Sequence, residues 1–197
     1  LLSFATHPSW TLNYLLRERF ELSNLKEHIR QGSNTAVTVS EYFTSLLDQT
    51  MDWKAAEAIR AEWGGPFCLK GVMSVECARR AIDIGASAIM ISNHGGRQLD
   101  GSRAPFDQLA EIVDAVGDRL EVILDGGVRR GTHVLKALSL GARAVSGGRL
   151  YLYALAAAGQ PGVERILGKL RDEIERDMKL MGARMLADLS RENLRFR

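Results

Sequence analysis

The chain has 197 residues, of which 46% are hydrophobic and 25% are charged, which is ordinary for a globular protein that can bury a core. The 26 basic and 24 acidic side chains leave a net charge of +2 without basic–aromatic clusters, so we expect no nucleic-acid partner. Two cysteines are too few for a disulfide framework or a zinc site, and we expect Cys68 and Cys77 to be reduced core residues of a cytoplasmic protein.

The first 52 residues are predicted to form a helix followed by a long variable loop. Pro8 lies near the start of a segment that predicts a helix over residues 10–20. Residues 21–50 are polar and weakly periodic, which indicates a loop, with a short surface helix expected over residues 44–51. The chain begins Leu1-Leu2-Ser3 without an initiator methionine or a leader, so we expect it to start partway through a longer protein.

From residue 53 onward, helical segments alternate with short apolar strands, as in parallel βαβ units. Helices are predicted at 53–63, 75–84, 106–116, 132–140, 150–158 and 162–181, and strands at 67–70, 88–92, 121–124 and 142–146. We therefore expect an α/β fold of the (β/α)8 TIM-barrel type, with residues 53–161 forming its last four βα units and residues 162–197 a C-terminal helix and tail. An open doubly wound sheet is the alternative, but no GxGxxG motif opens a helix, which disfavours nicotinamide binding.

The most informative motif follows the second predicted strand and reads Ser92-Asn93-His94-Gly95-Gly96-Arg97-Gln98-Leu99-Asp100. A histidine can move a proton near neutral pH, an arginine can bind a carboxylate through two parallel hydrogen bonds, and glycines let a ligand approach the backbone. This order of residues predicts a site that binds a small organic acid and removes a proton from it. A structural histidine beside an ordinary glycine turn is the plainer alternative.

Charged residues also follow the other three predicted strands. Lys70 ends the first strand, where it needs either a partner or a path to solvent. The third strand leads into Asp125-Gly126-Gly127-Val128-Arg129-Arg130-Gly131, whose amides and arginines suit a phosphate. The fourth leads through Ser146-Gly147-Gly148-Arg149 into a helix, and helix N-terminal amides beside an arginine also favour phosphate. Because the carboxyl ends of parallel strands share one edge, we expect these four segments to form one site.

Together these motifs closely resemble the family of FMN-dependent 2-hydroxy acid oxidases and dehydrogenases, which includes glycolate oxidase, L-lactate dehydrogenase and mandelate dehydrogenase. The resemblance implies FMN as the cofactor, oxidation of an L-2-hydroxy acid to the 2-oxo acid, and no metal. It implies that His94 is the catalytic base, that Arg97 binds the substrate carboxylate, and that Lys70 and Ser92 contact the flavin. The residues that would hold the ribityl chain and phosphate are Asp125, Gly126, Gly127, Val128, Arg129, Gly148 and Arg149.

The family barrel has eight strands, so the resemblance implies that this chain is the carboxyl-terminal half of such a protein. The missing amino-terminal half would supply further flavin contacts and the aspartate that orients His94. The implied partners are a small 2-hydroxy acid, an electron acceptor (oxygen, a quinone or a cytochrome) and further copies of the full-length protein in a homo-oligomer. The implied location is the cytoplasm, including the periphery of the inner membrane.

Two alternatives stay open beside this interpretation. One is a truncated half barrel that binds flavin weakly or not at all and has no activity. The other is a different FMN- or phosphate-binding barrel enzyme that shares only the phosphate site after the last two strands.

Overall fold

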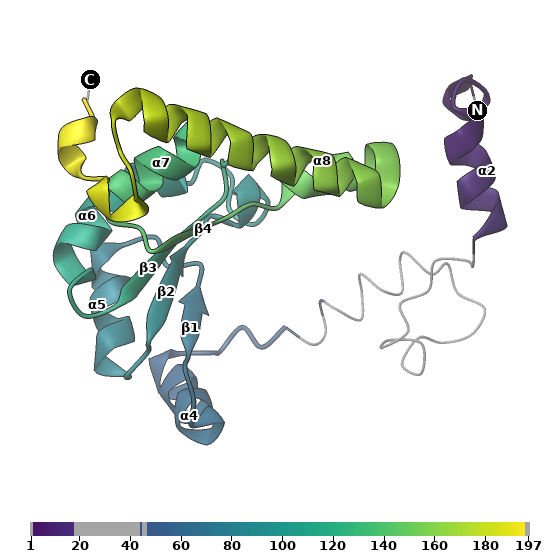
Figure 1. Cartoon of the computed structure of the whole chain (residues 1–197). Helices are drawn as coiled ribbons and strands as arrows, with labels where there is room; N and C mark the ends of the chain where they lie inside the picture. Colours follow the sequence, from purple (N-terminus) through teal and green to yellow (C-terminus); the bar gives the residue numbers. More distant parts are fainter. Residues whose placement is uncertain (1, 18–43, 45–46, 196–197) are drawn as a thin grey trace. The chain divides into compact units, whose positions relative to one another are not determined.

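The second part of the chain is built on one parallel sheet (Figure 1). The computed structural model describes residues 2–17, 44 and 47–195, and the chain divides into two compact units, Leu1–Thr50 and Met51–Arg197. The four strands of the second unit lie in chain order: β1 (Cys68–Lys70), β2 (Ala88–Ile91), β3 (Glu121–Asp125) and β4 (Ala144–Ser146). All three pairings are parallel, as the alternation of strands and helices predicts.

Helices connect the strands and cover one face of the sheet. The connecting helices are α5 (Val75–Asp83), α6 (Pro105–Val116) and α7 (Gly131–Ser139), and Figure 1 shows them together on one side. The helix α4 (Trp53–Trp63) precedes β1, and α8 (Arg149–Met181) follows β4 and packs on α7. Short 3-10 turns complete the unit at η2 (His94–Gly96), η3 (Leu186–Asp188) and η4 (Arg191–Asn193).

The two faces of the sheet differ in burial. Alternate strand residues point to the helices and form the core with them, and this set includes Ile89, Ile91, Val122 and Leu124, each at most 2% exposed. The residues between them point to the opposite face, where none is fully buried: Cys68, Lys70, Ala88, Met90, Glu121, Ile123, Asp125, Ala144 and Ser146. Helices of the second unit therefore cover only one side of the sheet.

This difference corrects the expectation for the cysteines. Both thiols are free, but Cys68 is exposed on the uncovered face, and only Cys77, on α5, is partly buried against the core. The prediction failed for Cys68 because an apolar strand sequence does not say which of its two faces is covered.

Local signals explain where the helices begin and end. The Asp52 side chain accepts from the Ala55 N–H and caps α4, and Gly64 ends it in the left-handed conformation with φ 65°. Ser74 caps α5 in the same way as Asp52. The backbone leaves the helical conformation at Ala158 and Gly159, so α8 has two segments, which agrees with the separate helices predicted there.

The first unit and its junction differ from the prediction in two places. The helix expected over residues 10–20 is α2 (Pro8–Leu16), preceded by α1 (Leu2–Ala5), while residues 18–20 and most of the expected 21–50 loop lie outside the described residues. Residues 47–51 are not helical, and residues 45–46 are not described. The Asp48 carboxylate accepts from both the amide and the hydroxyl of Thr50, at 2.8 and 2.6 Å, and this local turn competes with a helix.

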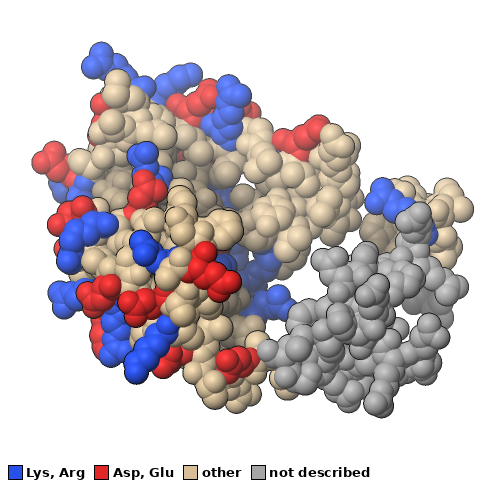
Figure 2. All heavy atoms as spheres, turned by 90° about the horizontal axis from the view of Figure 1, so that it is seen from below, with Lys and Arg blue, Asp and Glu red and all other residues tan. Residues whose placement is uncertain are grey.

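Basic and acidic side chains are interspersed over the face of the second unit that Figure 2 shows. Among the described helices, none is long and apolar enough to cross a membrane.

Candidate functional site

Three strand ends meet in one hydrogen-bonded cluster. The Lys70 ammonium at the end of β1 lies 2.5 Å from Oδ2 of Asp125 at the end of β3 and donates to Ser92 Oγ at 2.9 Å. The Ser92 hydroxyl, just after β2, in turn donates to Asp125 Oδ2 at 2.6 Å. The three residues come from positions 22 to 55 apart in sequence. The predicted convergence of the first three strand ends is thus present in the structure.

Asp125 is held as a carboxylate. Burial alone would raise its pKa, but hydrogen bonds from Lys70, Ser92 and Ser146, together with the Lys70 charge, hold the pKa of Asp125 below its ordinary value. Lys70 is half-exposed, so its positive charge faces the uncovered side of the sheet while Asp125 anchors it. The Lys70 side chain therefore combines the two arrangements expected for it, a partner and a path to solvent.

The His94-Gly95-Gly96 turn has an unusual backbone. Its three residues all have positive φ, at 56°, 69° and 72°, and His94 is the one non-glycine residue with positive φ among the described residues. The His94 N–H donates to Ser92 Oγ at 3.1 Å, which ties this turn to the cluster. A non-glycine residue in this conformation costs roughly 1–3 kcal/mol and is frequent at ligand sites. The sequence does not predict this conformation of His94.

The His94 ring lies against the end of β1. A Cβ at Gly71 would lie 3.1 Å from His94 Cε1, so the glycine leaves the space that the ring needs. The side chain of His94 is exposed, and within the described part of the chain no carboxylate forms a hydrogen bond or ion pair with it. Arg97 follows the turn, is exposed, and has no side-chain partner among the described residues.

The fourth strand end joins the same edge through Arg149. This arginine begins α8 and donates from Nη2 to the carbonyl oxygen of Gly95 at 2.8 Å, which connects segments 54 residues apart. A Cβ at Gly95 would lie 2.8 Å from the same nitrogen, so a side chain there would displace the Arg149 guanidinium from this position. The other N–H groups of the guanidinium make no contact with described residues and are available to a ligand.

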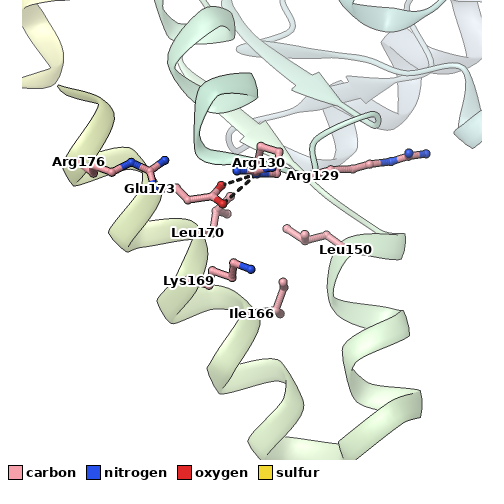
Figure 3. A pocket seen from close by; sticks show the side chains of 8 residues that line it. All are labelled: Arg129, Arg130, Leu150, Ile166, Lys169, Leu170, Glu173 and Arg176. Carbon is pink, nitrogen blue, oxygen red and sulfur yellow. Dashed lines mark hydrogen bonds and ion pairs between the residues drawn. The ribbon is translucent and has the colours of Figure 1, made fainter. Parts of the chain in front are cut away.

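The two consecutive arginines of the 126–131 loop have different surroundings (Figure 3). Arg130 Nε donates to both carboxylate oxygens of Glu173 on α8, at 2.8 and 3.0 Å. The Arg129 side chain points away from Glu173 and is exposed, while its backbone N–H donates to His133 Nδ1. Of the two arginines expected to suit a phosphate, Arg130 is anchored to Glu173 through Nε, whereas the Arg129 side chain forms no hydrogen bond or ion pair with the described residues.

Glu173 is a residue that the sequence analysis missed. It is 6% exposed, and its Oε2 also accepts from the Gly131 N–H at 2.8 Å. Hydrogen bonds from Arg130 and from the Gly131 amide lower the pKa of Glu173. One signal was available, because Glu173 interrupts the apolar stripe of α8 formed by Ile166, Leu170 and Ile174.

A cavity of about 300 Å³ lies between this loop and α8 (Figure 3). Arg129 and Arg130 line it on the loop side, and Leu150, Ile166, Lys169 and Leu170 line it from the two segments of α8. The cavity lies beside the predicted phosphate residues and does not reach Lys70 or His94.

The chain is similar in sequence to a known protein family and to several of its relatives. Residues 1–196 match the model of the family described as FMN-dependent dehydrogenase. The chain belongs to this family. It is 43% identical to the pre-mycofactocin synthase of Mycobacterium tuberculosis (strain ATCC 25618 / H37Rv) over 94% of this chain and 47% of that protein. It is 40% identical to the L-lactate dehydrogenase of Azorhizobium caulinodans over 98% of this chain and 51% of that protein.

The fold of this chain is also similar to solved structures of flavocytochrome b2 and mandelate oxidase. A flavocytochrome b2 variant matches with a TM-score of 0.72 and 45% identity, over 79% of this chain and 42% of that one. A mandelate oxidase variant with (S)-mandelic acid matches with a TM-score of 0.69 and 49% identity, over 72% of this chain and 42% of that one. This chain spans about half the length of the curated relatives that it matches.

FMN, the cofactor named in the family's description, fits the donor set on this sheet edge. A phosphate needs cationic and N–H donors, and the exposed Arg129 and Arg149 and the N-terminus of α8 at Gly148 offer them. A Cβ at Gly127 or Gly148 would meet nothing within 4 Å, so the backbone there is open to a ligand. Lys70 would offer a positive charge to a bound flavin from the uncovered face of the sheet.

Proposed function

We propose that this chain carries the carboxyl-terminal half of the active site of an FMN-dependent 2-hydroxy acid dehydrogenase or oxidase. The observation that carries the proposal is the convergence of Lys70, Ser92 and Asp125 beside the His94 turn, with Arg149 bonded to that turn. One edge of the sheet thus carries a positive charge at Lys70, a side chain at His94 that can accept a proton, and N–H donors that can bind a phosphate. The family match favours this interpretation over an unrelated phosphate-binding barrel enzyme.

Each residue would have a separate role. His94 takes a proton from the substrate, and Arg97 binds the substrate carboxylate through its planar guanidinium. Lys70, held by Asp125, places positive charge beside the flavin ring, and Ser92 contacts the ring. Gly126, Gly127, Val128, Arg129, Gly148 and Arg149 hold the ribityl chain and phosphate. FMN, when bound, accepts the electron pair that the substrate loses on becoming a 2-oxo acid.

The whole protein would be a (β/α)8 barrel, and its other half would come before this chain in the sequence. This is supported by the sheet face that bears Lys70, Met90 and Ile123, which none of the helices described over residues 51–195 covers. Strands of the other half would close the barrel over that face and would bring a carboxylate to the His94 ring.

A second candidate concerns the substrate. The pre-mycofactocin synthase of Mycolicibacterium smegmatis is 51% identical over 142 residues, which cover 72% of this chain. The alternative is therefore that the protein acts on the substrate of pre-mycofactocin synthase and not on a free 2-hydroxy acid.

Complementation tests the proposal. We would co-express this chain with the half of the Azorhizobium caulinodans L-lactate dehydrogenase that it does not match, and add L-lactate, glycolate or mandelate to the purified complex without oxygen. We expect one of the acids to bleach the flavin absorbance, and His94→Gln to slow the bleaching about a hundredfold or more while keeping the flavin. A flavin-loaded complex that none of the three acids bleaches contradicts the 2-hydroxy acid assignment and favours the second candidate.

A further inference from the structure

We propose that Glu173 is a positioning residue that fixes the 126–131 loop from α8 and so determines where Arg129 meets the phosphate of FMN. This inference rests on the proposed function, because it assigns the loop to the phosphate. It concerns a residue outside the four strand-end motifs, in the second segment of α8.

Glu173 binds the end of the loop at two points. Its carboxylate accepts from Arg130 Nε with both oxygens and from the Gly131 N–H with Oε2. The Glu173 side chain is buried, so water competes little for these hydrogen bonds. One buried carboxylate therefore holds both a side chain and the first backbone amide of α7.

The two segments also approach too closely for any side chain at position 131. A Cβ at Gly131 would lie 2.7 Å from Glu173 Cβ and 2.7 Å from the Ile174 amide nitrogen. Backbone contact between the start of α7 and α8 is thus possible only with glycine there. This close packing brings the Glu173 carboxylate within reach of the loop.

Arg129 lies between fixed points. Its own N–H donates to His133 Nδ1 at 3.2 Å, and the next two residues are bound to Glu173. With its backbone held, the Arg129 side chain points away from Glu173, as Figure 3 shows. Without this contact, Arg130 would lose its anchor, and the backbone that follows Arg129 would be held less firmly.

The test compares Glu173→Gln with Glu175→Gln in the full chain. Glutamine keeps an acceptor for the Gly131 N–H but loses the charge that binds Arg130. Glu175 is an exposed residue two positions further on that forms an ion pair with Arg171 of the same helix. The first readout is hydrogen exchange of the Arg129 and Gly131 amides without flavin. The second is affinity for FMN and for riboflavin, which lacks the phosphate, measured by fluorescence titration.

We expect Glu173→Gln to speed exchange of these amides about tenfold and to weaken FMN binding about tenfold, with riboflavin binding changed less than about twofold. Glu175→Gln should change none of these. Arg130→Met should reproduce the loss of FMN affinity, and the double variant should be no weaker than either single one, because both remove the same contact.

Three results would overturn the inference. They are unchanged amide exchange in Glu173→Gln, an equal loss of FMN and riboflavin affinity, or additive losses in the double variant. A wild-type chain that binds FMN no better than riboflavin would instead contradict the proposed function itself, and the inference with it.

Discussion

Lys70 and Asp125 form an ion pair across the end of the strand between them, with Nζ and Oδ2 2.5 Å apart. The Ser92 hydroxyl, at the end of that middle strand, bonds to both partners. The charge of Lys70 is therefore fixed in position by two neighbouring strand ends before any ligand arrives. Such preorganised charge is what electrostatic catalysis requires.

Removing the lysine should leave Asp125 without its cationic partner. We expect Lys70→Met to lower the free energy of unfolding at pH 7 by about 1 kcal/mol or less, because Lys70 is half-exposed and solvent screens the pair. The exposed Lys54 on α4 provides the control, and Lys54→Met should change the urea midpoint very little. Equal effects of the two substitutions would show that the pair contributes no stability.

Acid should weaken the fold through Asp125 and Glu173. Hydrogen bonds lower the pKa of both carboxyl groups in the folded state, in each case against the effect of burial, which raises it. A lowered pKa contributes stability that is complete above the unfolded pKa, about 4 for either group, and is lost as pH falls through the folded pKa. We expect the urea concentration at the unfolding midpoint to decrease when the pH is lowered below about 4. In the double variant Asp125→Asn and Glu173→Gln, the urea midpoint should decrease less steeply with falling pH than in the unaltered chain. An identical pH dependence of the two proteins would contradict this assignment.

The space that Gly71 leaves for His94 can be tested with a matched glycine. Gly71→Ala and Gly64→Ala both place alanine at positive φ, +93° and +65°, and each should cost roughly 1–2 kcal/mol in free energy of unfolding. Only at Gly71 would the new Cβ meet the His94 ring, whereas at Gly64 it meets nothing within 4 Å. The imidazole NMR resonances of His94 should therefore move in Gly71→Ala and stay in Gly64→Ala. An unmoved His94 resonance in both variants contradicts the contact.

Two glycines, Gly131 at the α7–α8 packing and Gly168 at an exposed position of α8, should respond in opposite directions. Gly131→Ala forces a Cβ against the α8 backbone and should destabilise the protein by about 1–3 kcal/mol. Gly168→Ala, in α8 with nothing within 4 Å of the new Cβ, should stabilise it by about 0.5–1 kcal/mol, because alanine favours the helix. Urea unfolding of the two variants gives both values. The same sign for both would contradict the packing at Gly131.

The sequence predicted the order of elements because local signals mark them clearly. Ser74 caps the start of α5 and Gly64 ends α4, and the bounds of the four strands lie within two residues of the predicted ones. One strand begins later than expected, at Ala144, because the Ala142 N–H still bonds to the carbonyl of Ala137 at the end of α7. The chain order of polar motifs after parallel strands was enough to bring Lys70, Ser92 and Asp125 together.

What the sequence could not predict depends on contacts between distant segments. The partner of Arg130 lies 43 residues away on α8, so nothing local distinguished this arginine from Arg129. The left-handed backbone of His94 depends on the turn that Ser92 and Arg149 hold around it. The exposure of Cys68 depends on which face of the sheet the helices cover.

We propose that the third and fourth strand ends of this chain hold the phosphate of FMN. The most direct measurement is a fluorescence titration of the full chain with FMN and with riboflavin, repeated with Arg149→Met. We expect FMN to bind about tenfold or more tightly than riboflavin, since charge-assisted contacts to phosphate are the strong ones, and Arg149→Met to remove most of that difference. Equal affinities for FMN and riboflavin in the unaltered chain would contradict the claim.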